Sequence, residues 1–147
     1  KANIRAVLID RDNTIVSREG HILEDDVLPW IRELKQEGIK AMIVSNSFKP
    51  YVAHDAEKLE IDYLIKALKP LPFGLIRAMR KLEVTASQTL MVGDQIFTDI
   101  VAANLVGMRS VLVEPLTQKD LWHTVQLRKL DKIILRGIPL EEKLTEL

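Results

Sequence analysis

Two aspartates one residue apart, Asp10 and Asp12, directly follow the apolar run of residues 6–9. An all-apolar run that ends in charged residues is typical of a buried parallel strand. In an extended segment, side chains at positions i and i+2 point to the same side, roughly 6.6–7 Å apart. This arrangement suits two acids that share one phosphorus centre, one attacking it and one protonating the group that leaves. Two carboxylates so close repel each other unless a cation lies between them or one is protonated, so the pair predicts a bound metal ion.

Polar residues also follow the next three apolar runs of the chain. Ser45 and Asn46 follow the second run, Lys69 comes soon after the third, and Asp94 follows the fourth after one glycine. In open α/β sheets the ligand crevice lies outside the carboxyl ends of the strands. We therefore expect one crevice that receives carboxylates, hydroxyls and an ammonium from four separate parts of the chain.

The elements that must position these residues alternate along the chain, which predicts an α/β fold with a mainly parallel sheet. We expect strands at residues 6–9, 41–44, 63–65, 89–92, 110–113 and 132–135. We expect helices at residues 25–37, 50–59, 72–82, 98–106 and 119–130, with a short last helix at 139–147. Gly38 and Gly107 suit helix ends, and Pro72 suits the first turn of a helix.

Length and composition predict a single domain over residues 1–147. Lys plus Arg and Asp plus Glu number 21 each, and this zero net charge gives no reason to expect binding to nucleic acid. The chain has no cysteine, which excludes disulfides, thiolate chemistry and cysteine-based zinc sites. It has no apolar run of roughly 20 residues and no signal-peptide pattern, so we expect a soluble protein, and the lack of cysteine fits a cytoplasmic one. Because the sequence starts at Lys1 rather than at a methionine, we also expect a fragment of a longer protein.

The residues that could carry chemistry form four motifs in order along the chain: Asp10-x-Asp12-x-Thr14, Ser45, Lys69 and Gly93-Asp94-x-x-x-x-Asp99. This series resembles the four motifs of the haloacid dehalogenase (HAD) superfamily and spans about residues 6–113. Two segments, Ile-Val-Ser-Asn-Ser and Val-Gly-Asp-Gln-Ile-Phe-Thr-Asp, resemble the corresponding motifs of the YqeG-type HAD-IIIA phosphatases. This subgroup is related to eukaryotic mitochondrial phosphatidylglycerophosphate phosphatases. The resemblance implies a Rossmann-like three-layer fold with the strands in the order fifth, fourth, first, second, third.

The resemblance also implies a Mg²⁺-dependent phosphomonoester hydrolase, and elementary chemistry gives each acid a role. Asp10 would attack phosphorus and form an aspartyl-phosphate. Asp12 would protonate the leaving oxygen and later accept a proton from the hydrolytic water. Mg²⁺ would be held by Asp10, by Asp94 and, as the resemblance implies, by the backbone carbonyl of Asp12.

Further residues would bind the phosphoryl group or support the site. Ser45, Asn46 and Lys69 would bind the phosphoryl oxygens, where negative charge is spread in the transition state. Thr14 and Asp99 would lie behind the reacting groups, and we expect Asp99 to orient Lys69 or a metal-bound water rather than to contact the metal. Structural alternatives stay open, since Ser45 could cap a helix, Lys69 could be a surface lysine, and Asp99 could be a simple acid in the first turn of a helix.

The connections after the first two strands are too short for a folded cap domain. Between Asp12 and Ser45 the expected helix and strand leave only residues 15–23 for a small flap. One helix and one strand fill the chain from Ser45 to Lys69. Unless a second subunit of a homo-oligomer covers it, such a crevice is open and suits a phosphate on a large molecule, such as a lipid headgroup or a protein.

Basic residues give two places for contact with a large partner. Arg11, Arg18 and Lys49 could contact a substrate at the rim of the crevice. Residues 121–135 mix apolar and basic side chains and could touch a membrane surface peripherally, or pack against the sheet with their charges solvated.

Two other functions stay open at this point. A receiver-like phosphoacceptor module also unites acids, hydroxyls and a lysine at strand ends, but receivers carry the phosphorylated aspartate after the third strand, and no aspartate follows that strand here. A non-catalytic scaffold could keep the same fold, although the fold alone would not require the acid pair, the lysine and Asp94.

Overall fold

Within residues 3–19 and 21–117, five parallel strands form a sheet, as the alternating sequence pattern predicts. The computed structural model describes residues 3–19 and 21–117. The strands are β1 (Ala6–Ile9), β2 (Lys40–Val44), β3 (Asp62–Leu64), β4 (Thr89–Gly93) and β5 (Arg109–Leu112). Their order across the sheet is β3-β2-β1-β4-β5, which confirms the expected topology. The expected strand at 132–135 and the expected helices at 119–130 and 139–147 lie outside the described residues.

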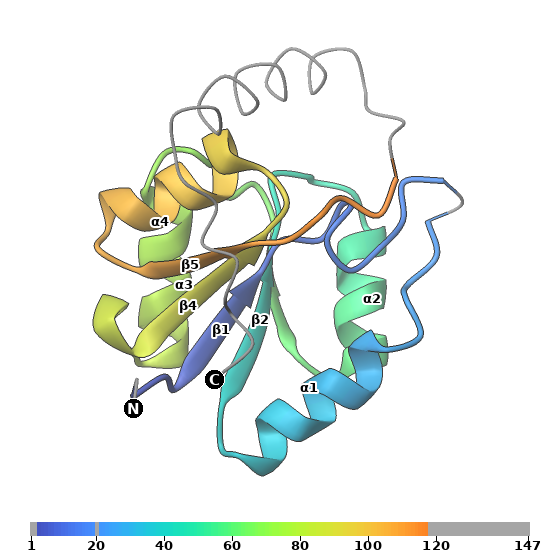
Figure 1. The fold of residues 1–147 in the computed structure, drawn as a ribbon, viewed down its shortest axis with the longest axis horizontal. Helices are drawn as coiled ribbons and strands as arrows, with labels where there is room; N and C mark the ends of the chain where they lie inside the picture. Colours follow the sequence, from blue (N-terminus) through green and yellow to red (C-terminus); the bar gives the residue numbers. More distant parts are fainter. Residues whose placement is uncertain (1–2, 20, 118–147) are drawn as a thin grey trace.

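Helices cover both faces of the sheet and produce the three layers seen in Figure 1. The helices α1 (Val27–Gln36) and α2 (Tyr51–Leu59) lie on one face, and α3 (Phe73–Leu82) and α4 (Val101–Leu105) lie on the other. A short 3₁₀ turn, Ala86–Gln88, precedes β4. Within residues 3–19 and 21–117, no helix has the length and apolar character needed to cross a membrane.

The central strand β1 is buried on both faces because helices pack against each of them. Val7 belongs to the hydrophobic cluster that includes Ile31 of α1. Leu8 belongs to the opposite cluster, which includes Leu75 of α3. All residues of β1 are therefore removed from water, and this rigid strand delivers Asp10 to the carboxyl edge of the sheet.

The turn after β4 differs from the regular helix that we expected at residues 98–106. A π-helical turn spans Ile96–Ile100, and the α-helix that follows covers only Val101–Leu105. The difference has a local cause, since a carboxylate oxygen of Asp99 accepts a hydrogen bond from the backbone N–H of Gln95 at 3.2 Å. Single π-helical turns occur frequently at functional sites, and this one fixes the Asp99 side chain.

The described connections at the carboxyl edge are short, as the sequence led us to expect. In the β1–α1 connection, Val16 forms isolated bridges with Asp12 and Leu23, so this part of the chain folds back on itself as a small flap. The β2–β3 connection contains α2 and turns. Neither of these described connections contains a folded cap domain.

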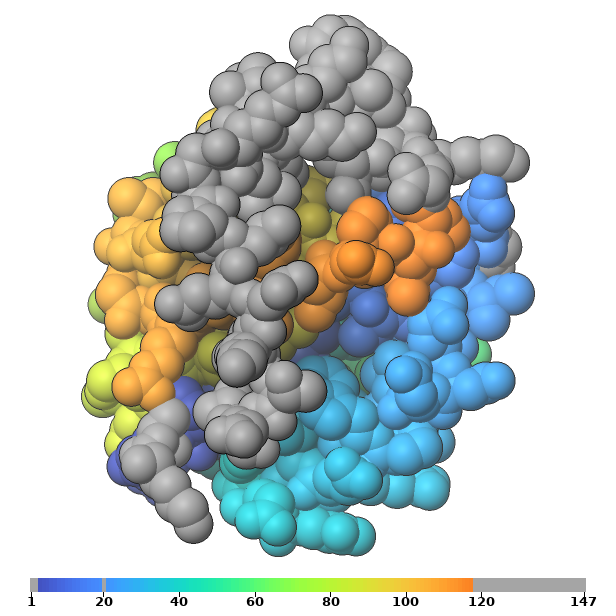
Figure 2. All heavy atoms as spheres, viewed as in Figure 1, coloured from blue at the N-terminus to red at the C-terminus, as the bar shows by residue number. Residues whose placement is uncertain are grey.

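The segment that follows β5 returns to the loop that follows β1. In Figure 2 the orange segment after β5 lies directly against the blue segment after β1. The backbone N–H of Leu116 donates to the carbonyl of Asn13 at 3.1 Å. The hydroxyl of Thr117 donates to Asn13 Oδ1 at 2.8 Å, and Asn13 Nδ2 donates to the carbonyl of Thr117 at 3.3 Å. These hydrogen bonds connect the loop after β1, which carries the acid pair, to the segment after β5.

Candidate active site

A buried ion-pair network lies at the carboxyl edge of the sheet. Lys69 Nζ donates to Asp10 Oδ1 and to Asp99 Oδ1, at 2.7 Å in each case. The side chains of Lys69 and Asp99 are each 1% exposed, whereas that of Asp10 is 14% exposed. Asp10 is thus the member of this network that an incoming ligand can reach.

The ammonium of Lys69 keeps its charge in spite of burial. Burial alone would lower the pKa of Lys69, but the carboxylates of Asp10 and Asp99 outweigh this effect and raise the pKa above its ordinary value. Lys69 is therefore a fixed positive charge at neutral pH. Such a charge is suited to binding phosphoryl oxygens, and the alternative of a surface lysine is wrong.

Asp99 lies in a space that depends on the glycine at position 93. A Cβ at Gly93 would overlap the Asp99 carboxylate, so only glycine lets this carboxylate approach the end of β4 so closely. Burial and the neighbouring Asp10 raise the pKa of Asp99 from 3.8 to about 6, although Lys69 acts in the opposite direction. Because Asp99 is fully buried, the alternative of a simple first-turn acid is wrong.

Three carboxylates come close enough to share a metal ion. Asp10, Asp94 and Asp99 each offer one oxygen, and these oxygens lie within 4.8 Å of one another. The hydroxyl of Thr14 lies 3.4 Å from Asp10 Oδ2 and 3.3 Å from Asp94 Oδ1, so it bridges two of the three acids. The cluster contains the expected ligands Asp10 and Asp94, and it adds Asp99, which we expected only behind the reacting groups.

The loop after β2 holds the backbone of Lys69. Asn46 Nδ2 donates to the carbonyl of Lys69 at 2.8 Å, and Asn46 Oδ1 accepts from the backbone N–H of Lys69 at 2.7 Å. This two-way contact gives Asn46 a supporting role at the backbone of Lys69, and its binding of a phosphoryl oxygen through the second N–H of the amide stays a prediction. Ser45 is buried, and its hydroxyl oxygen accepts from the backbone N–H of Ser47 at 3.1 Å. The Ser45 hydroxyl keeps its own proton, which it can donate to a phosphoryl oxygen.

Arg11 is buried and does not lie at the rim, contrary to the sequence-based prediction. Its side chain is 1% exposed, and its guanidinium donates to Asp12 Oδ1 and to Asp55 Oδ2, at 2.6 Å in each case. Arginine is almost never fully buried unless it is paired, and the two carboxylates account for its position. Of the other two expected rim residues, Arg18 is half-buried and Lys49 is exposed.

The sequence analysis missed two residues of α2 that contact Arg11. Asp55 accepts from its guanidinium, and the ring of Tyr51 lies 4.1 Å from Arg11 Cζ. The available signal was the position of Asp55 between Val52 and Leu59 on the apolar side of an amphipathic helix. A charged residue on a buried helix face requires a partner, and the sequence does not say where that partner lies.

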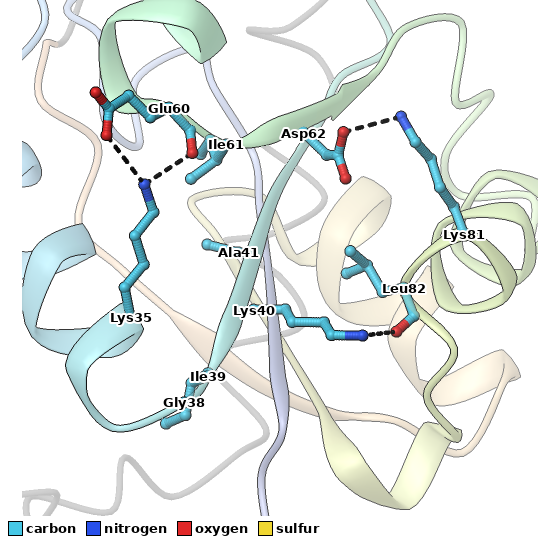
Figure 3. Close-up of a pocket in the computed structure, with 10 residues that line it drawn as sticks. All are labelled: Lys35, Gly38, Ile39, Lys40, Ala41, Glu60, Ile61, Asp62, Lys81 and Leu82. Atoms are coloured by element: carbon cyan, nitrogen blue, oxygen red, sulfur yellow. Dashed lines mark hydrogen bonds and ion pairs between the residues drawn. The ribbon is translucent and has the colours of Figure 1, made fainter.

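A cavity lies at the amino-terminal edge of the sheet, opposite the edge that carries Asp10, Asp94 and Asp99. Its volume is about 440 Å³, and Figure 3 shows the side chains that line it. Lys40 donates to the carbonyl of Leu82, and Lys35 donates to the carbonyl of Glu60, at 2.7 Å in each case. These two lysines satisfy carbonyls at the C-terminal ends of α3 and α2, a structural role that needs no ligand.

Sequence comparison identifies the family. The haloacid dehalogenase-like hydrolase family matches residues 18–107, which is more than half of the chain. The chain belongs to the haloacid dehalogenase-like hydrolases. Membership of this family confirms the resemblance carried by the four motifs and the expected Rossmann-like α/β fold.

Named relatives of this HAD-like hydrolase are phosphatases. The chain is 32% identical over 136 residues to "Probable phosphatase YqeG" of Bacillus subtilis, a match that covers 92% of this chain and 79% of the relative. It is 31% identical over 146 residues to phosphatidylglycerophosphate phosphatase 1, chloroplastic/mitochondrial, of Arabidopsis thaliana. That second match covers 92% of this chain but only 42% of the relative, so the chain spans less than half of the plant protein.

A solved structure shares the fold of this HAD-like hydrolase. It is the 3-deoxy-D-manno-octulosonate 8-phosphate phosphatase of Moraxella catarrhalis in complex with a magnesium ion, a phosphate ion and a KDO molecule. The TM-score is 0.55 at 21% identity, and the match covers 65% of this chain and 60% of the other. Together, the family match and the named relatives support the phosphatase that the motifs indicated.

Proposed function

We propose that the protein is a Mg²⁺-dependent phosphomonoester hydrolase that acts through an aspartyl-phosphate on Asp10. The observation that carries this proposal is the position of Asp10, a partly accessible carboxylate held by the buried ammonium of Lys69 and bridged by Thr14 to Asp94. A carboxylate so placed has a fixed orientation and lies beside a positive charge that can also bind the phosphoryl group. These are the requirements for attack on a phosphate ester.

The reaction proceeds in two displacements that use Asp10 and Asp12. In the first, a carboxylate oxygen of Asp10 forms a bond to phosphorus while the bond to the leaving oxygen breaks, and Asp12 gives that oxygen a proton. In the second, a water attacks phosphorus and loses a proton to Asp12, and the bond between phosphorus and Asp10 breaks. Lys69 and Ser45 bind phosphoryl oxygens in both displacements, because each can donate a hydrogen bond to them.

The donor set at the site fits Mg²⁺. Hard cations prefer oxygen ligands, and the single ammonium of Lys69 does not balance the three neighbouring carboxylates of Asp10, Asp94 and Asp99. Asp10, Asp94 and the backbone carbonyl of Asp12 are the proposed ligands, with Asp99 kept on Lys69. Bound there, Mg²⁺ would supply positive charge that shields the attacking carboxylate from the phosphate.

A lipid-linked phosphate is the proposed substrate class. Four apolar side chains are between 50% and 67% exposed: Phe48 in the loop after β2, Leu68 and Leu71 in the loop after β3, and Phe73 at the start of α3. Backbone hydrogen bonds from Ala67 to Ser45 and from Lys66 to Ser47 join these two loops, so both loops flank the proposed phosphate site at Lys69. Large exposed apolar side chains on neighbouring loops are suited to contact with a lipid, and the relatives include a phosphatidylglycerophosphate phosphatase.

The reaction is tested by phosphate release from a generic phosphate ester with Mg²⁺ or with a chelator. We expect release only with the metal, and losses of about 10³-fold or more in Asp10→Asn and Asp12→Asn. Asp62→Asn, which removes an exposed acid on β3, is the matched control and should retain activity. Full activity in Asp10→Asn would overturn the mechanism, and a persistent acyl-phosphate in the native protein would indicate a receiver-like module instead.

The substrate class is tested with phosphatidylglycerophosphate in mixed micelles beside soluble glycerol phosphate. Phe48→Ser and Phe73→Ser should lower activity on the micellar lipid by about 10-fold while leaving the soluble ester unaffected, because only the lipid buries these rings. Leu105→Ser on α4 removes an equally exposed apolar side chain and serves as the control. Equal activity of all variants on the lipid would exclude a role for these loops.

A further inference from the structure

Arg11 lies between the two aspartates of the first motif and is fixed on several sides. Its Nη1 donates to Asp12 Oδ1, and its Nε donates to Asp55 Oδ2, at 2.6 Å in each case. The side chain of Arg11 is 1% exposed and that of Asp55 is 6% exposed. Asp55 belongs to α2, so the guanidinium connects the first-motif loop to a helix that is distant in the sequence.

Aromatic contacts restrict the guanidinium from a further direction. The ring of Tyr51 lies 4.1 Å from Arg11 Cζ, in the geometry of a cation–π contact. The hydroxyl of Tyr51 lies 3.2 Å from Ser47 Oγ in the loop after β2. The ring of His21, in the flap, stacks on Tyr51 with a centroid separation of 5.4 Å. The stack therefore runs from the flap through Tyr51 to the side chain that holds Asp12.

We propose that Arg11 is a positioning residue that holds the acid–base carboxylate of Asp12, and that Asp55 and Tyr51 fix Arg11 for this purpose. The inference rests on the proposed phosphatase function and assigns new roles to three residues that the four motifs do not include. Arg11 engages Oδ1 of Asp12, which leaves Oδ2 to exchange the proton with the leaving group and with water. Without this contact, the Asp12 side chain, which is 28% exposed, can rotate among its staggered conformations.

An arginine is required because two different N–H groups of one guanidinium bind two carboxylates. The planar guanidinium presents several N–H groups in fixed directions, so it can bind Asp12 and Asp55 at once while its face lies on the ring of Tyr51. A lysine would keep the charge but would bring a single ammonium that lacks this planar geometry. Arg11→Lys therefore separates the positioning role from the charge.

The test compares esters that differ in their need for a general acid. An aryl phosphate with an acidic phenol as its leaving group needs little protonation, whereas an alkyl phosphate needs it strongly. We expect Arg11→Lys and Asp55→Asn to lower the rate of the first displacement, measured as single-turnover release of the leaving group, by about 10-fold to 100-fold on the alkyl ester and by less than about 3-fold on the aryl ester. Asp12→Asn should show the same selectivity, and Glu57→Gln, an exposed acid on α2, is the control.

Several outcomes would overturn the inference. One is an equal loss on both esters in a variant whose thermal unfolding matches that of the native protein, because this would indicate general damage to the site. Unchanged kinetics on the alkyl ester would also overturn it. If Arg11→Lys fails to fold, the kinetics of Asp55→Asn test the inference instead. This variant keeps the size of the side chain and an acceptor oxygen but removes the negative charge.

A structural readout keeps the inference separate from the proposed function. If the native protein releases phosphate from neither ester, the phosphatase proposal fails, and the Arg11 contacts are then judged by nuclear magnetic resonance. We expect the guanidinium N–H signals of Arg11 to exchange slowly with water, and Asp12→Asn and Asp55→Asn should each shift them and speed their exchange. Signals that either variant leaves unchanged would overturn the inference.

Discussion

The Nζ atom of Lys69 lies 2.7 Å from a carboxylate oxygen of Asp10 and 2.7 Å from a carboxylate oxygen of Asp99. One buried ammonium therefore joins the proposed nucleophile at the end of β1 to the π-helical turn after β4. Removal of the ammonium leaves two neighbouring carboxylates without a counter-charge, which is costly in a buried site.

Lys69→Met should abolish most of the activity and also destabilise the protein. We expect kcat to fall by about 10²-fold to 10³-fold, because the variant lacks the cation that binds the phosphoryl oxygens. The free energy of unfolding should fall by about 3–5 kcal/mol, since Asp99 becomes a buried carboxylate without its ammonium. Phosphate release and urea denaturation measure the two effects. Lys66→Met, at an exposed lysine of the same loop, should change neither.

Asp99 should make the metal-free protein less stable as the pH rises from about 4 to about 6. Its pKa is raised from 3.8 to about 6, so the folded state holds this proton more tightly than the unfolded state does. The contribution of Asp99 to stability is thus fully present below pH 3.8 and is lost as the pH rises through about 6. Urea denaturation in a chelator should show the native protein losing stability relative to Asp99→Asn over this range. A constant difference between the two proteins would contradict the raised pKa.

Gly93→Ala should displace Asp99, because the added Cβ would overlap its carboxylate. We expect a loss of about 1–3 kcal/mol in the free energy of unfolding, which is typical of overpacking, together with a loss of activity. The double variant Gly93→Ala with Asp99→Gly removes the overlap, which involves the Cβ of Asp99 as well as its carboxylate, and should be no less stable than Asp99→Gly alone. Additive losses in this double-mutant cycle would place the clash elsewhere.

Mg²⁺ should stabilise the folded protein through the carboxylate cluster. At a concentration about 100 times its Kd, the ion should add about 2.7 kcal/mol to the free energy of unfolding, because the unfolded chain does not present the assembled site. Thermal unfolding with Mg²⁺ and with a chelator measures this difference. Asp94→Asn should remove most of it, whereas Asp62→Asn should keep it. Equal stabilisation of all three proteins would place the ion outside this cluster.

The sequence predicted the parts of the site that depend on strand order. Asp10 and Asp94 come directly after strands that are buried and adjacent, so the carboxyl edge brings them together once the sheet order is known. The predicted strand bounds lie close to the observed ones, because uninterrupted apolar runs give a clear signal. The start of the helix after β4 was wrong because a side-chain contact, from Asp99 to the backbone of Gln95, sets the π-helical turn there.

Contacts between loops could not be predicted from the sequence. The two-way hydrogen bond between Asn46 and the backbone of Lys69 depends on the conformations of two separate loops, and no local pattern encodes it. The burial of Arg11 depends on Asp55, which is distant in the sequence. The position of Arg11 between two acids suggested an exposed residue at the rim of the crevice. In the structure its side chain is buried and paired with Asp12 and Asp55.

The contact between Asn13 and Thr117 has a consequence for the order in which the protein matures. The two residues are 104 positions apart, so the loop that carries Asp12 gains this support only after the chain through Thr117 has been synthesised. Closing so long a segment costs conformational entropy, and this cost precedes the free energy gained from the contact. We therefore expect a nascent chain that stops short of β5 to form the first strand and its helices without a competent acid pair. The protein would then become active only after β5 has joined the sheet.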